Sequence, residues 1–153
     1  MPNVSQKQKQ GFTLLELLIT IALIGILSSI IAMTMVNPQK NARDAKRKSD
    51  LELIRSGLEI YSSDCGSYPA TSSFIPGTAS PLPLSGTTGT CSGNTYITTV
   101  PVDQTSGRNY SYVLTTATTY ALCAALEMAP SPAMDVTGCG SCGATCNYKV
   151  TNP

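Results

Sequence analysis

An apolar run near the N-terminus constrains the fold of this chain more than any other feature. Residues 12–36 contain one charged side chain, Glu16, and residues 17–36 contain none. Twenty helical residues reach about 30 Å, the thickness of the hydrocarbon layer of a bilayer. The run therefore predicts a membrane-spanning helix. A carboxylate inside such a helix indicates a partner or a function, unless it lies near the headgroups and reaches water.

The residues before this run are polar and mildly basic. Residues 1–10 carry Lys7 and Lys9, as at the start of a secretory signal. The apolar run is too long for the hydrophobic region of a cleaved signal. Ala32-Met33-Thr34 is a poor small-residue cleavage site. A signal anchor that is never cut is one interpretation.

The junction between the two segments supports a more specific interpretation. Residues 9–19 read Lys-Gln-Gly-Phe-Thr-Leu-Leu-Glu-Leu-Leu-Ile. This sequence resembles the type III signal of type IV prepilins and of type II secretion pseudopilins. The resemblance implies cleavage after Gly11 by a prepilin peptidase on the cytoplasmic side and methylation of the new amine on Phe12. That amine can neutralise Glu16 of the same subunit, and the resemblance implies pairing with a neighbour during filament assembly.

Two residues are expected to deform the helix. A glycine inside a helix costs up to about 1 kcal/mol relative to alanine, and in a membrane it permits close helix packing. The resemblance implies that the stretch after Gly25 can lose helical structure in a filament. The family often has a proline about eight residues further on, where this chain has Met33. The next proline here is Pro38, where we expect a kink.

A basic cluster follows the apolar run. Five cations and two acids lie within residues 40–50. The positive-inside rule would keep such a cluster in the cytoplasm. The prepilin-like signal and the cysteines favour the opposite side, and we give them more weight. Anionic headgroups or a neighbouring subunit are possible partners of the cluster, whose members are Lys40, Arg43, Lys46, Arg47 and Lys48, with Asp44 and Asp50.

An amphipathic helix is predicted next. Leu51, Ile54, Leu58 and Tyr61 recur at spacings of three and four residues. We expect the helix to continue from the membrane segment to about Ser63 and to end at Gly66 and Pro69. The likeness to major pseudopilins extends over roughly the first seventy residues. The other faces of the helix are expected to carry Asp50, Glu52, Arg55, Ser56 and Glu59.

The remaining sequence predicts a small sheet. Residues 69–95 are rich in Ser, Thr, Pro and Gly and predict a long surface loop. Alternating patterns predict antiparallel strands near 110–115, 119–127 and 146–151, packed on the apolar stripe. The expected fold is α+β and type IV pilin-like, with a long helix against a small sheet. The expected parts are a leader (1–11), a membrane and filament-core helix (12–36) and a globular domain (37–153) that includes an amphipathic helix at about 39–63.

Six cysteines, all beyond the apolar run, predict disulfides in an oxidising compartment. A zinc site is the competing interpretation of the CxxC at 139–142. The chain has no histidine and no second CxxC, which argues against zinc. Six cysteines allow 15 pairings. The expected pairs are Cys65–Cys91, Cys123–Cys146 and Cys139–Cys142.

The sequence argues against catalysis and against a resident metal or other cofactor. Without histidine there is no Ser-His or Cys-His pair, and no glycine-rich phosphate loop follows a strand. Relatives of this type often bind calcium in a loop near the Tyr-x-Tyr strand. The acids of this chain beyond position 100 are Asp103, Glu127 and Asp135, and they lack a calcium-loop spacing.

The resemblance implies a structural subunit of a type IV pilus or of a type II secretion pseudopilus. Such a subunit waits in the inner membrane with its globular part outside the cytoplasm and then joins a filament. Its implied partners are copies of itself or related pilins, the prepilin peptidase, the assembly platform and, before assembly, lipid.

Two alternatives stay open. One is a competence-type pilin for DNA uptake, although beyond Arg55 only Arg108 and Lys149 are basic and the net charge is +1. The other is a single-pass membrane protein with an unrelated disulfide-rich ectodomain.

Overall fold

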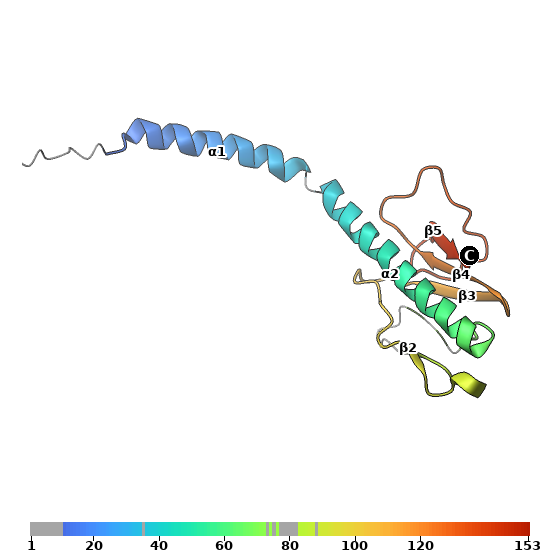
Figure 1. The fold of residues 1–153 in the computed structure, drawn as a ribbon. Coiled ribbons are helices and arrows are strands. Elements are labelled where there is room, and N and C mark those ends of the chain that lie inside the picture. Colours follow the sequence, from blue (N-terminus) through green and yellow to red (C-terminus); the bar gives the residue numbers. More distant parts are fainter. Residues whose placement is uncertain (1–10, 35, 73, 75, 77–82, 88) are drawn as a thin grey trace, which may run out of the picture. The chain divides into compact units, whose positions relative to one another are not determined.

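The computed structural model describes residues 11–34, 36–72, 74, 76, 83–87 and 89–153. The chain divides into two units, one up to Gln39 and one from Lys40 onward. Figure 1 shows the two helices and the strands of the second unit. The first unit contains α1 (Leu14–Thr34) and the first turn of α2 (Val36–Cys65).

Helix α1 is apolar on every side. Its window Leu14–Ile31 is long and apolar enough to cross a membrane by length and composition, and none of it is buried within the structure. The Thr20 and Ser29 hydroxyls donate to the carbonyls of Leu17 and Ile26, at 2.8 and 2.7 Å. These hydroxyls are therefore satisfied inside the helix, as a lipid environment requires.

Helix α2 buries the predicted stripe. Leu51, Ile54 and Leu58 are each 0% exposed. The helix ends where Gly66 adopts a φ of 80° and its N–H donates to the Ser62 carbonyl at 2.9 Å. This positive-φ glycine is a common helix C-terminal signal and confirms the predicted end of the helix.

The kink expected at Pro38 stays a prediction. Helix α1 is described as far as Thr34 and α2 from Val36 onward, and residue 35 lies outside the described residues. Pro38 lies in the first turn of α2. Proline is tolerated there because its missing N–H would have no intrahelical acceptor.

The predicted three-stranded sheet is confirmed. It consists of β3 (Ser111–Thr116), β4 (Thr119–Ala124) and β5 (Tyr148–Thr151), antiparallel in that spatial order. Tyr112 lies opposite Leu122, which lies opposite Val150. The central strand β4 is buried on both faces, because alternate residues enter two separate cores. Tyr120, Leu122 and Ala124 join the core with α2, whereas Ala121 and Cys123 join the second core.

The segment predicted as a long loop contains a small second sheet. It pairs β1 (Leu84–Ser85) with β2 (Thr95–Ile97), and a 3₁₀ turn (Gly89–Cys91) lies between them. Parts of the predicted loop lie outside the described residues. A Cβ on Gly57 of α2 would lie 2.4 Å from side-chain atoms of Ile97. Glycine at this position therefore lets β2 pack directly on the helix.

Candidate processing and assembly site

The predicted cleavage junction is accessible. Gly11 and Phe12 precede α1 in an irregular segment, and the Phe12 side chain is 91% exposed. Apart from its chain neighbours, no described residue has a heavy atom within 4 Å of the position that a Cβ on Gly11 would take. The peptide bond between Gly11 and Phe12 is thus open to a protease in this conformation.

Glu16 has a local partner that the sequence analysis missed. The Thr13 N–H and hydroxyl donate to Glu16 Oε2 at 2.9 and 2.8 Å, and the Glu16 N–H donates to the Thr13 hydroxyl at 3.2 Å. This reciprocal arrangement is a capping box, and its Thr-x-x-Glu signature was readable at residues 13–16. The carboxylate is held by neutral donors at the start of α1. Both hydrogen bonds to this carboxylate end on Oε2, one of its two oxygens.

The solvent face of α2 carries a second stripe opposite the buried one. Its members follow each other at spacings of three and four residues, so they share one face of the helix. None is charged, and most have small side chains. Two are large and apolar, Leu53 at 49% and Ile60 at 55% exposure. The stripe consists of Ala42, Ala45, Ser49, Leu53, Ser56, Ile60 and Ser63.

Such a face is suited to pack against another helix. Small side chains let two helix axes approach closely, and exposed leucine and isoleucine offer apolar area to bury. The exposed stripe carries no charge, whereas Asp44, Arg47 and Asp50 lie on the buried side of α2. Ser56 was expected on an outer face, and it lies in the middle of this stripe.

The basic cluster of α2 is partly internal to the fold: Arg47 is buried, whereas Arg43 and Lys46 are exposed. Arg47 is 2% exposed and donates through Nε to Asp103 Oδ2 at 2.6 Å and through Nη1 to Asp44 Oδ1 at 2.6 Å. Its Nη2 donates to the Thr105 hydroxyl at 2.7 Å, and its Nη1 also reaches Glu127 Oε1 at 3.1 Å. One guanidinium thus connects α2 to residues 103–105 and to the end of β4.

Neighbouring groups complete this arrangement, which we call the Arg47 cluster. Arg43 donates to both Glu127 carboxylate oxygens at 2.6 Å. The Asp44 carboxylate accepts the N–H groups of Glu127 and Met128, at 2.9 and 2.8 Å. From the sequence, these charges were expected to contact anionic headgroups or a neighbouring subunit. That interpretation was wrong for Arg47, because three carboxylates balance its burial.

The cluster shifts the pKa values of its acids. The Arg43 hydrogen bond, aided by Arg47, lowers the pKa of Glu127 to about 2. Burial alone would raise the pKa of Asp103, but the Arg47 hydrogen bond and the Thr105 N–H outweigh it and lower that pKa. Both carboxylates therefore stay ionised well below neutral pH.

Two other acids of α2 also contradict the expected polar face. Asp50 is 3% exposed, accepts the Tyr110 hydroxyl at 2.8 Å and pairs with Lys46 at 2.7 Å. Glu59 accepts one tyrosine hydroxyl on each oxygen, from Tyr120 at 2.8 Å and from Tyr68 at 2.9 Å. These carboxylates fix the tyrosines of the core against the helix, because a buried hydroxyl needs a partner.

A second set of contacts lies at the C-terminal end of α2. Cys65 forms a disulfide with Cys91, as predicted. Asp64 accepts the Asn94 side-chain amide at 2.9 Å and also the Tyr96 hydroxyl. The end of α2 is therefore joined both covalently and by hydrogen bonds to the segment around β2.

The other two predicted disulfide pairings are wrong. Cys123 pairs with Cys139, and Cys142 pairs with Cys146. Together with Ala121 and Ala125 these residues form the second core, on the face of the sheet away from α2. The sequence placed Cys123 and Cys146 on neighbouring strands, but β5 begins only at Tyr148, so Cys146 lies before the strand.

Among the residues that the structure describes, no group of three or more acidic, cysteine or histidine side chains could hold a metal. Asp103 and Glu127, which the sequence analysis weighed as calcium ligands, contact Arg47 instead. Gly25 lies within α1, with nothing within 4 Å of the position of a Cβ. The predicted flexibility at Gly25 and Pro38 stays a prediction.

Comparison with known proteins concerns the N-terminal part of the chain. Residues 6–32 match the prokaryotic N-terminal methylation motif. The chain is similar to the type II secretion system core protein G of Aeromonas hydrophila, with 35% identity over 60 residues, and of Dickeya chrysanthemi, with 32% over 59. These stretches cover 39% of this chain and 42% and 39% of the two relatives, so the chain spans about two fifths of their length.

The protein of Escherichia coli K12 with the same name is 32% identical over 57 residues, which are 37% of this chain and 39% of that protein. No solved structure matches the chain significantly. The processing motif and these relatives together support the resemblance seen at residues 9–19. Through this N-terminal part, the chain is similar to the pseudopilins of type II secretion and carries the N-terminal methylation motif.

Proposed function

We propose that this chain is a structural subunit of a pilus-like filament, and specifically of a type II secretion pseudopilus. A prepilin peptidase cleaves it between Gly11 and Phe12, and the new amine of Phe12 is methylated. The mature subunit is held in the inner membrane by α1 with residues 40–153 outside the cytoplasm. It then leaves the lipid to join copies of itself or related subunits, through an assembly platform.

The observation that carries this proposal is the wholly exposed apolar helix directly after the processing motif. Within Leu14–Ile31 no part is buried by the rest of the chain, so this surface needs lipid or other subunits to cover it. The exposed stripe on α2 also offers apolar surface for another subunit to cover, and this stripe lies in the globular unit. Two exposed helix faces in one chain are what a filament with a helical core requires.

The choice of a secretion pseudopilus follows from the relatives, all of which carry the name type II secretion system core protein G. DNA uptake receives less support from the contacts of the basic residues. Arg43, Lys46 and Arg47 are paired with acids, Arg108 donates to the Ala125 carbonyl and Lys149 donates to the Thr137 carbonyl. Few cations remain to bind phosphates.

The test is to express the full chain with a prepilin peptidase in membranes and to measure the intact mass of the product. We expect the loss of residues 1–11 and the gain of one methyl group on Phe12. The control is Gly11→Val, which places a branched side chain at the cleavage position and should leave the chain uncut. An unchanged N-terminus in the wild-type chain would falsify the proposed processing.

A second measurement concerns assembly. Filaments purified from cells that also make the platform proteins should contain the mature chain. Full processing without any incorporation into filaments would contradict the structural role and favour a single-pass membrane protein.

A further inference from the structure

The segment between β4 and β5 exposes an apolar surface that the proposed function does not explain. Residues 128–134 read Met-Ala-Pro-Ser-Pro-Ala-Met and contain no charge, although Glu127 precedes them and Asp135 follows. Met128 is 42% and Met134 is 40% exposed. Among the described residues after α1, only Leu53 and Ile60 are other large apolar side chains with comparable exposure. We call residues 128–134 the methionine loop.

This loop is anchored at both ends. At the first end, the Met128 N–H donates to Asp44 Oδ2 at 2.8 Å, and Glu127 is bound by Arg43 and Arg47. At the second end, Lys149 donates to the Thr137 carbonyl at 3.0 Å and Cys139 is joined to Cys123. An apolar segment presented between fixed ends loses little conformational entropy when it binds.

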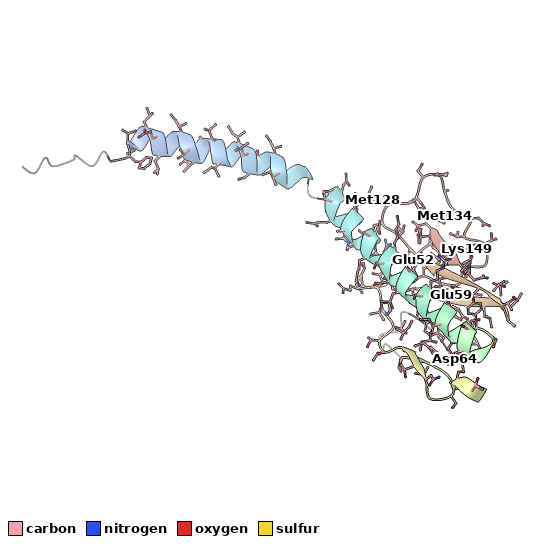
Figure 2. The ribbon with its side chains drawn as sticks, in the orientation of Figure 1. Glu52, Glu59, Asp64, Met128, Met134 and Lys149 are labelled. Atoms are coloured by element: carbon pink, nitrogen blue, oxygen red, sulfur yellow. A yellow bond between two sulfur atoms is a disulfide. The ribbon has the colours of Figure 1, made fainter. Side chains whose placement is uncertain are left out.

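The first attachment of the loop, at Asp44, is close in sequence to α1, the proposed membrane-spanning helix. Asp44 lies ten residues after Thr34, the end of α1. Ten residues span about 15 Å as a helix and at most about 35 Å when extended. The base of the loop is therefore within reach of the surface of a bilayer that holds α1. In Figure 2, Met128 lies nearer to the start of α2 than Glu59 does, whereas Asp64 lies at the other end of the helix.

We propose that the methionine loop is a lipid-contact surface, which rests in the interfacial layer of the bilayer that holds α1 before assembly. The inference depends on the proposed membrane-anchored state of the subunit. Methionine and proline side chains are apolar and uncharged, and a methionine adapts its shape to irregular surroundings, as the boundary between headgroups and acyl chains demands. The contact orients the globular unit while the subunit waits for assembly.

The contact is driven mainly by apolar burial and only weakly by charge. Arg43, Lys46 and Arg47 are paired with acids of the same fold, so they offer little to anionic headgroups. A few partly exposed side chains bind weakly by themselves. Because α1 holds the loop at the membrane, its effective concentration is high and weak binding suffices.

The chain contains no tryptophan, which permits a direct test. In the Met134→Trp variant of the full chain, the introduced indole is the sole tryptophan. The variant is reconstituted in vesicles of phosphatidylethanolamine and phosphatidylglycerol, with and without bromine on the acyl chains. Bromine quenches an indole that lies at its depth. We expect a blue-shifted emission and a loss of intensity in the brominated vesicles, both largely unchanged by added salt.

The matched control is Thr118→Trp, in the exposed turn between β3 and β4. The Ala117 carbonyl in this turn accepts the Tyr68 N–H, which places the turn beside the C-terminal end of α2. We expect its indole to emit as in water and to escape quenching.

Two outcomes would overturn the inference. One is water-like, unquenched emission from the Met134→Trp variant. The other is a blue shift without quenching that grows with protein density, which would indicate a second copy on the loop. If residues 1–11 are still removed and Phe12 becomes the N-terminus in either case, the inference fails alone. Quenching without this processing overturns the proposed function instead.

Discussion

Arg47 and Asp103 are 56 residues apart in the sequence, yet the Arg47 Nε donates to Asp103 Oδ2 at 2.6 Å inside the fold. Both side chains are nearly inaccessible, at 2% and 4% exposure. The contact shows how the globular unit is built around α2. The helix supplies a buried cation, and two distant segments supply the acids that balance it.

Replacing Arg47 should destabilise the globular unit strongly. Arg47→Met leaves Asp44, Asp103 and Glu127 together without their shared cation, and breaking a buried ion pair in this way costs about 3–5 kcal/mol. Arg47→Lys should recover part of this loss, since lysine keeps the charge but has three donors in place of the five that a planar guanidinium offers to its carboxylate partners. The measurement is urea unfolding of the full chain in detergent.

The matched control for Arg47 is Arg55→Met. Arg55 pairs with Glu52 at 3.5 Å on the surface of the same helix. A pair of this kind is worth at most about 1 kcal/mol. Equal losses of stability in the Arg47 and Arg55 variants would refute the structural role of the Arg47 cluster.

The free energy of unfolding should decrease as the pH is lowered through a window set by the pKa of Glu127. The pKa of this carboxyl is lowered from 4.5 to about 2 in the fold, so the unfolded chain takes up the proton first. The stabilisation is present above 4.5 and is lost as the pH falls toward about 2. Asp103, whose pKa is also lowered, contributes with the same sign.

The measurement is the urea midpoint as a function of pH for the wild type and for Glu127→Gln. The variant lacks the titrating group, so its midpoint should decline less across this window. Parallel declines for the two proteins would show that Glu127 is not responsible.

The disulfides should differ in their contributions to stability. Cys65 and Cys91 are separated by 26 residues, whereas Cys142 and Cys146 are separated by 4. The chain-entropy model assigns about 3.5 kcal/mol to the longer loop and about 2 kcal/mol to the shorter. Paired Cys→Ala variants, compared by denaturant unfolding, should follow this order. A reversed order would mean that packing of the second core outweighs loop closure.

A charge in the exposed stripe of α2 should block assembly without unfolding the chain. Ser56→Glu places a carboxylate among uncharged neighbours that are proposed to pack on another subunit. We expect cleavage and the urea midpoint to stay at wild-type values while the amount of subunit in filaments drops. Thr118→Glu, at an exposed position away from this stripe, is the control and should assemble. Normal filaments from the Ser56→Glu variant would show that the stripe is not part of the interface between subunits.

Glu16 should matter for assembly more than for cleavage. The carboxylate caps α1 through Thr13, and in the proposed filament it meets the amine of another subunit. Glu16→Ala loses both contacts, whereas Thr13→Ala loses only the cap. An N-terminal cap contributes about 1 kcal/mol to a helix. We expect filament incorporation to fail in Glu16→Ala and to persist at a reduced level in Thr13→Ala, as measured by immunoblot of sheared filaments.

Local patterns predicted the main elements because their causes are local. The spacing of Leu51, Ile54 and Leu58 identified the buried face of α2, and alternation around Tyr112 and Leu122 identified two strands. The motif at Gly11 and Phe12 indicated the resemblance to pilins and pseudopilins, because the motif is a short linear stretch of sequence. In each case the information lies within a few neighbouring residues.

The missed features depend on partners far away in the sequence. Arg47 looked exposed because its acids come from positions 103 and 127, and Asp50 looked exposed because Tyr110 is 60 residues away. The pairing of Cys123 depends on the path of the loop before β5. The strands β1 and β2 have two and three residues, which is too short for a periodic signal.

The attachments at the two ends of α2 have a mechanical consequence. The Arg47 cluster holds the helix near one end and the Cys65–Cys91 disulfide holds it 18 residues later, a distance of about 27 Å along the axis. When a filament is pushed or pulled along its helices, the load enters the globular unit at both attachments together. The globular unit is then loaded in shear between two fixed points, a geometry that resists peeling of the domain from its helix.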